Sequence, residues 1–174
     1  MTRITSAVLA IGLLAGISTA TFAADAEVPA DTYSAMGFYL RGDAGWSYLD
    51  TRNGTGNNAV LGGGLGYQIN EFLRTDVRGD MAGIGSDDKY LNTLTGNIYF
   101  DIPTDTMITP YLGAGAGYGW ASGNDDGMAY SLMAGASVNI SESFAADVGY
   151  RYRQILDGQD PSDHEILVGL RYKF

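Results

Sequence analysis

The stretch His164-Glu165-Ile166-Leu167-Val168-Gly169-Leu170-Arg171-Tyr172-Lys173-Phe174 decides the fold of this chain. Side chains of a β-strand point alternately to its two faces. One face here is apolar and the other polar: Ile166, Val168, Leu170, Tyr172 and Phe174 share the first, and Glu165, Gly169, Arg171 and Lys173 share the second, where Leu167 is the one large apolar residue. A strand between lipid and a polar lumen has this pattern.

The composition limits what the chain can be. Its 174 residues are enough for one domain, and a formal net charge of -10 does not suit a nucleic-acid-binding protein, which needs a basic surface. The absence of cysteine excludes disulfides, thiol nucleophiles and cysteine-based metal sites. The 25 glycines and 12 tyrosines, beside only 4 prolines, favour a β-protein with close backbone contacts and aromatic belts. A hydrophobic content of 45% is too high for a disordered chain.

The first 23 residues have the features of a secretory signal peptide. Arg3 supplies the positive charge, residues 7–17 are apolar, and Thr21-Phe22-Ala23 places small residues at the two positions that a signal peptidase reads. We predict cleavage after Ala23, then a short periplasmic leader at 24–36 and a barrel domain at 37–174. A transmembrane anchor is the alternative, but the apolar run is short for one.

Seven earlier segments repeat the alternation of the last one. The predicted strands cover residues 37–48, 59–68, 73–81, 90–100, 109–121, 128–140, 146–153 and 164–174. Tight turns alternate with acidic loops between them. No later stretch has the ~20 consecutive apolar residues of a membrane helix, and an open sheet would leave backbone groups unpaired in lipid. The sequence therefore predicts an all-β fold, an eight-stranded antiparallel up-and-down transmembrane β-barrel.

The segment 73–81 is the most informative internal strand. Arg74, Asp76, Arg78 and Asp80 share one face with alternating sign. In a soluble sheet that face would meet water, but the same face is charged in several other strands. Because unpaired buried charges cost several kcal/mol, a narrow lumen has to pair them. We therefore predict a lumen charge network made of Arg41, Asp43, Arg74, Asp76, Arg78, Asp80, Asp147, Arg151, Arg153, Glu165 and Arg171.

Two glycine-rich segments suggest ligand sites, and neither has the required spacing. Glycine alternates with other residues through 113–119, whereas a dinucleotide fingerprint is G-x-G-x-x-G at the start of a helix. We expect these glycines to leave room in the lumen for Arg and Tyr side chains from opposite strands. Residues 122–127 have the composition of a calcium loop but lack its ligand spacing and closing Glu. No cofactor or metal site is predicted.

The aromatic residues of the apolar faces sort into two belts, because amphipathic rings prefer the headgroup level of a membrane. With the N-terminus in the periplasm, the outer belt is Trp46, Tyr48, Tyr90, Tyr118, Trp120, Tyr130 and Tyr152, and the inner belt is Phe38, Tyr67, Phe100, Tyr172 and Phe174.

Four stretches carry a family resemblance: Gly37-Phe38-Tyr39-Leu40-Arg41-Gly42-Asp43-Ala44-Gly45, Pro110-Tyr111-Leu112-Gly113-Ala114-Gly115, Gly149-Tyr150-Arg151-Tyr152 and Gly169-Leu170-Arg171-Tyr172-Lys173-Phe174. With them, essentially all of the mature chain resembles the OmpA-like/opacity-type family of small outer-membrane surface barrels, in the form common in alphaproteobacteria. The resemblance implies an outer-membrane location and a role for Phe174 as a signal to the outer-membrane assembly machinery. Larger OmpA proteins carry a peptidoglycan-binding domain after the barrel, so cell-wall anchoring is not carried over to this chain.

The sequence favours a structural or surface-interaction barrel that contacts outer-membrane lipid and lipopolysaccharide. An eight-stranded barrel is just wide enough for side chains, so a wide pore is not expected, and a narrow low-conductance channel is the first alternative. Adhesion to an unknown surface ligand is the second. It would use an acidic outer rim, for which solvation of the loops is the simpler explanation. The rim residues are Asp50, Asp87, Asp88, Asp125, Asp126, Asp157, Asp160 and Asp163.

Enzymatic modification of lipid A is not expected. The deacylase type of eight-stranded barrel uses a His, Ser and Glu triad with the His two residues before the Ser. The one histidine here is His164, and Ile166 stands two residues later. We therefore interpret His164 as a residue of the barrel rim.

The predicted network leads to a test with two variants. Arg78→Ala should destabilise the barrel because it leaves an acid unpaired in the lumen, whereas Asp125→Ala in a loop should not. Comparing the gel mobility of cold and heated samples of each variant measures this difference. Equal behaviour of the two variants would count against a buried network.

Overall fold

The computed structural model describes residues 36–51, 54–84, 90–121, 125–156 and 162–174, and all of its elements are strands. These are β1 (Gly37–Thr51), β2 (Gly54–Gln68), β3 (Leu73–Ile84), β4 (Leu91–Asp101), β5 (Ile108–Ala121), β6 (Asp125–Asn139), β7 (Phe144–Leu156) and β8 (Ser162–Lys173). No helix in these ranges is long and apolar enough to cross a membrane. The predicted signal peptide and nearly all of the predicted leader lie outside the described residues.

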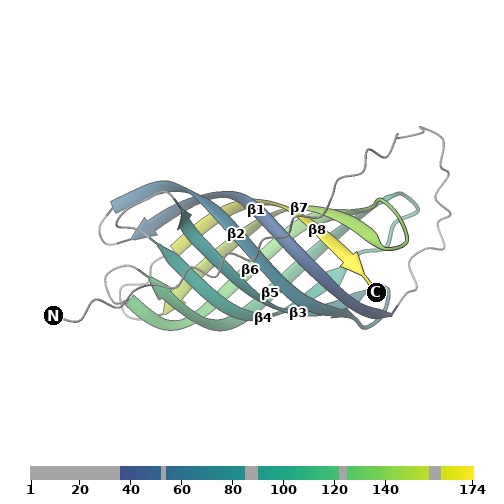
Figure 1. The fold of residues 1–174 in the computed structure, drawn as a ribbon, viewed down its shortest axis with the longest axis horizontal. Helices are drawn as coiled ribbons and strands as arrows, with labels where there is room; N and C mark the ends of the chain where they lie inside the picture. The colour runs from purple at the N-terminus through teal and green to yellow at the C-terminus, as the bar shows by residue number, and fades with distance from the viewer. Residues whose placement is uncertain (1–35, 52–53, 85–89, 122–124, 157–161) are drawn as a thin grey trace.

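The eight strands form one closed antiparallel barrel, in which each strand pairs with its neighbour in sequence (Figure 1). The first and last strands close the barrel, with Leu40 opposite Tyr172 and Trp46 opposite Ile166. The pairing extends to the final residue, whose amide donates to the carbonyl of Phe38 at 3.0 Å. The predicted fold class is therefore confirmed. We call the end that holds both the start of β1 and the end of β8 the turn end, and the opposite one the loop end.

Several strands run further toward the loop end than the sequence pattern predicts. Residues 50–58 were expected to form a loop, but β1 and β2 stay paired through Tyr48 opposite Asn57 and Asp50 opposite Thr55. In the same way, β6 begins at Asp125 and β7 continues to Leu156. The predicted loops are too long because the backbone ladder does not depend on apolar side chains: pairing continues through Asn, Asp and Gly residues that are typical of turns.

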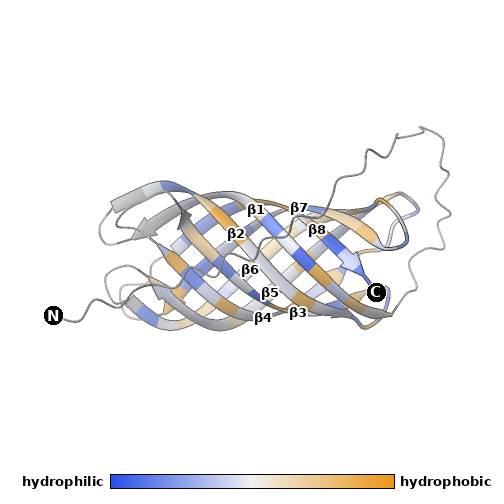
Figure 2. Cartoon of the chain, viewed as in Figure 1, coloured by the Kyte–Doolittle hydropathy of each residue, from blue (hydrophilic) through white to orange (hydrophobic). Residues whose placement is uncertain are grey.

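The outer surface of the barrel is apolar and its inner face is polar, the reverse of a soluble barrel. Hydrophobic and hydrophilic residues accordingly alternate along the strands (Figure 2). In β4, for example, Leu94, Ile98 and Phe100 are about half exposed, whereas Thr95 and Asn97 between them are buried. Exposed apolar residues continue around all eight strands. A continuous apolar surface of this extent is typical of a barrel surrounded by lipid.

The inner face is not polar throughout, which the sequence analysis did not anticipate. A cluster of buried apolar side chains lies at the loop end of the lumen. In β3 and β7 it begins at the next inward-facing position after the last charged residue: Ala82 comes two positions after Asp80, and Ile155 two positions after Arg153. The cluster consists of Val60, Ala82, Leu91, Ala121, Ala129 and Ile155, with Leu167 in contact. In β3 and β7 they lie between the charged residues and the loop end, whereas in β8 the charged Asp163 is itself the inward residue nearest that end.

Inward glycines make room for large lumen side chains, which at Gly66 and Gly113 come from the adjacent strand. Gly66 stands directly opposite Tyr39, and a Cβ there would collide with the Tyr39 ring. Gly113 stands opposite Tyr99, whose Cδ1 would lie 2.7 Å from an added Cβ. The expectation of side chains from opposite strands was therefore wrong at Gly113, the one of these two that lies in 113–119. Each ring lies over the neighbouring glycine, and the Tyr99 hydroxyl still reaches Arg41 of β1 at 3.0 Å.

This packing predicts different effects for two glycine substitutions. Gly66→Ala should lower the free energy of unfolding by about 1–3 kcal/mol, because the new methyl group displaces the Tyr39 ring. Gly42→Ala is the matched control on the outer face, where an added Cβ meets nothing within 4 Å. Urea unfolding of both variants in lipid vesicles measures the difference. Equal stability of the two variants would show that the ring does not need the glycine.

Candidate functional site

The structure places all eleven residues of the predicted charge network inside the barrel. They come from four strands, β1, β3, β7 and β8, and each residue is at most 8% exposed. Their inward direction follows from strand alternation, because each shares its parity with the other buried residues of its strand. The contacts among them, however, depend on how the four strands are arranged around the lumen.

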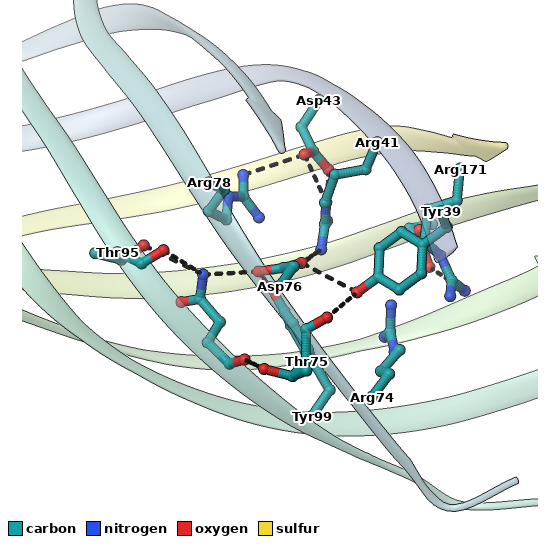
Figure 3. Close-up of polar contacts among 12 residues, drawn as sticks. Tyr39, Arg41, Asp43, Arg74, Thr75, Asp76, Arg78, Thr95, Tyr99 and Arg171 are labelled. Atoms are coloured by element: carbon teal, nitrogen blue, oxygen red, sulfur yellow. Dashed lines mark hydrogen bonds and ion pairs between the residues drawn. The ribbon is translucent and has the colours of Figure 1, made fainter. Parts of the chain in front are cut away.

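The turn-end half of the network is a chain of alternating acids and arginines (Figure 3). Asp76 pairs with Arg41 at 3.0 Å, and Arg41 pairs with Asp43 at 2.7 Å. Asp43 pairs in turn with Arg78 at 3.2 Å, and Arg78 pairs with Asp80 at 2.7 Å. Residues of β1 and β3 are thereby linked across β2, whose glycines leave the space between them open.

The same chain continues toward the loop end through β7 and β8. Asp80 pairs with Arg151 at 2.8 Å, and Arg151 also pairs with Glu165. Glu165 pairs with Arg153 at 2.6 Å, and Arg153 pairs with Asp163 at 2.9 Å. Every arginine of this chain therefore lies between two carboxylates, which lowers the cost of burying it.

Two further ion pairs lie outside this chain. Arg74 donates from Nε to Asp101 at 2.9 Å. Arg171 donates from Nε to Asp147 at 2.7 Å, and the Ser137 hydroxyl donates to the same carboxylate. Together with the chain, these pairs occupy all thirteen buried charged side chains of the described residues.

The sequence analysis missed two of the acids in these pairs. Asp163 was assigned to the external acidic rim, but it is fully buried and pairs with Arg153. Asp101 was assigned to a turn, but it is the last residue of β4 and points inward. Both errors came from ending the strands too early. The parity of Asp101 with Tyr99, and of Asp163 with Glu165, was the signal that could have identified them.

Buried tyrosines complete the network, and two of them, Tyr39 and Tyr111, were also missed. The Arg74 guanidinium carbon lies 4.4 Å from the ring centre of Tyr99 and 4.7 Å from that of Tyr111. The terminal nitrogens of Arg74 have no hydrogen-bond partner among the described residues, so the faces of these rings supply the compensating interaction. The Tyr39 hydroxyl lies 3.2 Å from the carbonyl of Thr75, to which it donates.

The lumen is close to neutral and closely packed. Six arginines and seven carboxylates are buried, and the half-buried Lys173 contacts Asn139 at 3.4 Å. A cavity of about 10 Å³ lies beside Arg78 and Arg151, which is room for about one water molecule. Within the described residues, no group of three or more His, Asp or Glu side chains is placed to hold a metal ion.

The predicted aromatic belts lie on the outer face. Ten of the twelve residues are at least 36% exposed, and Tyr130 and Tyr152 are half-buried against each other, with ring centres 6.1 Å apart. Tyr150 also points outward and is 45% exposed, although it was not assigned to a belt. His164 is exposed on the same face, where its Nδ1 lies 2.6 Å from the Tyr150 hydroxyl.

The acidic rim can be placed only in part. Asp126 is exposed on the outer face of β6. The strands include Asp50 and Asp125, but the positions of these two side chains lie outside what the structure describes. The remaining rim residues, Asp87, Asp88, Asp157 and Asp160, lie outside the described residues.

Comparisons with known proteins agree on the class of barrel. The profile of the family described as outer membrane protein beta-barrel domain matches residues 9–174. An uncharacterized protein of Brucella suis biovar 1 is 25% identical, and the match covers 92% of this chain and 86% of that protein. A similar uncharacterized protein of Brucella melitensis is 24% identical with the same coverage.

Two solved structures have the same architecture. The crystal structure of neisserial surface protein A (NspA) is 26% identical and has a TM-score of 0.71, covering 79% of this chain and 97% of that one. Ail, the attachment invasion locus protein of Yersinia pestis, is 17% identical with a TM-score of 0.58, covering 80% of this chain and 100% of that one. The likeness to Ail concerns the fold alone.

The Arg171–Asp147 pair offers a test of charge pairing in the lumen. Asp147→Leu should lower the free energy of unfolding by about 3–5 kcal/mol, because it leaves Arg171 buried without its carboxylate. Adding Arg171→Met to that variant should restore most of the loss, since both charges are then absent. Urea unfolding in lipid vesicles measures the three proteins. A double variant no more stable than Asp147→Leu alone would contradict the pairing.

Proposed function

This chain belongs to the outer membrane protein beta-barrel domain family, as an OmpA-like/opacity-type barrel, and we propose that it is a structural and surface-interaction protein with a plugged lumen. The observation that carries the plugged lumen is the unbroken chain of ion pairs from Asp76 to Asp163. To open a path, these side chains would have to leave partners that compensate their burial, which costs several kcal/mol for each charge.

The proposal includes an orientation in the membrane and a route to it. The signal peptide is removed after Ala23, residues 24–36 remain in the periplasm as a short leader, and the turn end faces the periplasm. Both ends of the barrel domain lie at the turn end, which supports this orientation (Figure 1). Phe174 then reaches the periplasmic boundary, where the assembly machinery would recognise it. The loop end faces outward, in contact with lipopolysaccharide.

A narrow channel is the second candidate, and the packing of the lumen argues against it. The glycines of β2 and β5 do not leave an open path: Tyr39 covers Gly66, Tyr99 covers Gly113, and the side chains of Asp80 and Asn97 lie against Gly62 and Gly115. At the loop end, the apolar cluster around Leu91 and Ile155 would have to be wetted before an ion could pass. A near-neutral interior also offers no excess charge to attract ions of either sign.

A catalytic function is not part of the proposal. The described partner of His164 is a tyrosine hydroxyl on the outer face of β7. A hydrolytic triad requires a nucleophile beside the histidine and an acid that orients it. Adhesion through the loops stays a secondary hypothesis, because most of the acidic rim lies outside the described residues.

The proposal predicts a membrane barrel without general solute flux. The full-length protein in the outer-membrane fraction should migrate differently in gels before and after heating, because a closed barrel resists unfolding by cold detergent. Liposomes that contain the refolded protein should swell in sugar solutions no faster than protein-free liposomes, because the lumen is filled.

The two measurements test different parts of the proposal. Unchanged migration on heating would contradict the membrane barrel itself. Sugar uptake at the rate of a general porin, by a protein that does show heat-modifiable migration, would overturn the plugged lumen alone. A large porin reconstituted in parallel serves as the positive control.

A further inference from the structure

The outer surface near the loop end carries a connected group of polar aromatic side chains. This rim cluster consists of Tyr130 of β6, Tyr150, Tyr152 and Gln154 of β7, and His164 of β8. The Tyr150 hydroxyl lies 2.6 Å from His164 Nδ1. The hydroxyls of Tyr130 and Tyr152 both donate to Gln154 Oε1, at 2.5 and 2.8 Å.

Strand register explains why these five side chains form one surface. Tyr130 stands directly opposite Gln154, and Tyr152 stands directly opposite His164. Directly opposed side chains on one face of a sheet are in contact. The ring centres of Tyr152 and His164 are accordingly 5.1 Å apart. The rim cluster is therefore a preorganised group of tilted rings, with 54° between the planes of Tyr152 and His164, and not a set of independent belt residues.

The level of the rim cluster in the membrane follows from the outer aromatic belt. Tyr130 and Tyr152 belong to that belt, and His164 stands directly opposite Tyr48, another of its members. Tyrosine rings on a lipid-facing surface are typical of the headgroup level of a membrane. Exposed apolar side chains lie on both sides of the cluster: Leu132, Val148 and Ile166 toward the turn end, and Met128 and Leu156 toward the loop end, where β6 also exposes Asp126. In the proposed orientation, the rim cluster lies at the headgroup level of the outer leaflet.

The rim cluster keeps hydrogen-bonding groups available for a ligand. Both tyrosines use the oxygen of Gln154, so within the described residues its amide nitrogen has no partner. The second ring nitrogen of His164 is likewise without a described partner, since the Tyr150 contact uses Nδ1. Groups that neighbours already hold in place lose little freedom when a ligand binds.

The charge of this surface indicates which part of a lipid headgroup it fits. Of the ten lysines and arginines, Arg3, Arg52 and Lys89 lie outside the described residues, and the other seven all belong to the inward face. Recognition of a phosphate group usually relies on Arg or Lys. A surface of aromatic rings, hydroxyls and an amide instead matches a sugar, which has apolar ring faces and many hydroxyl groups.

We propose that the rim cluster binds a sugar of the lipopolysaccharide headgroup, with the pyranose ring against Tyr152 and His164 and its hydroxyls bonded to Gln154 and His164. This inference rests on the proposed function, because it takes the loop end to face the outer leaflet. It adds a specific site on β6, β7 and β8 to a general contact with the membrane, and it assigns recognition to the sugar and not to its phosphates.

The test compares lipopolysaccharide retention by matched variants of the full-length refolded barrel in detergent. Gln154→Leu combined with His164→Phe removes the donors but keeps the apolar volume. Losing two hydrogen bonds should weaken retention about tenfold. Gln154→Glu, which keeps the acceptor oxygen and removes the amide donors, should weaken it in the same direction. Asn92→Leu removes a half-exposed polar side chain from the outer face of β4 near the loop end and should have no effect.

Native mass spectrometry with purified lipopolysaccharide, intact or enzymatically dephosphorylated, measures the retained ligand. Retention of both forms by the wild type, with loss in the two Gln154 variants only, supports the sugar site. Loss of binding on dephosphorylation, equal loss in Asn92→Leu, or full retention by the double variant would each overturn it. Heat-modifiable migration of every variant is recorded in parallel, so that failure of the barrel is distinguished from failure of the site.

Discussion

The burial of charge in a narrow lumen is the constraint on which the rest of this structure depends. An eight-stranded barrel encloses a space that side chains fill, so a charge pointing inward finds other side chains and almost no water. Each arginine of the lumen therefore needs carboxylates within reach, and each carboxylate needs arginines. The chain from Asp76 to Asp163 meets this need by alternation of sign, first along β1 and β3 and then across to β7 and β8. The apolar cluster at the loop end completes the enclosure.

The glycines and tyrosines of the inner face follow from the same constraint. A lumen that holds six arginines has little volume left, so several wall positions of β2 and β5 carry glycine. Tyr39 and Tyr99 lie across the neighbouring glycines, and Tyr99 and Tyr111 cover the guanidinium of Arg74 where hydrogen-bond acceptors are lacking. The outer face contacts lipid instead of buried charge. Its residues are mainly apolar, and hydrogen-bonded groups such as Tyr150 with His164 lie where the lipid headgroups would begin.

The sequence predicted more of the fold than of the candidate site. The number of strands, their order and the face of each network residue all follow from a period of two, which needs no knowledge of tertiary contacts. Strand ends were less well predicted, because paired backbone continues through Asn, Asp and Gly residues that are typical of turns. Because the predicted strands are too short, they leave out Asp101 and Asp163, which face inward and pair with Arg74 and Arg153. The outward cluster around Gln154 was also missed, since its members come from three strands and each one alone looks like a belt residue.

What the sequence by itself determined is the direction of each side chain: alternation sends charge to one face and apolar groups to the other, and only a closed barrel in lipid satisfies both. The tertiary structure decided which side chains pair with each other. Arg151 and Asp80 are 71 residues apart, and nothing local relates them until closure of the barrel brings β7 within reach of β3. The same holds for the rings around Arg74 and for the rim cluster. The direction of a side chain depends on the geometry of a single strand. Which residues pair depends on the register and stagger of all eight strands, which are fixed only when β1 pairs with β8.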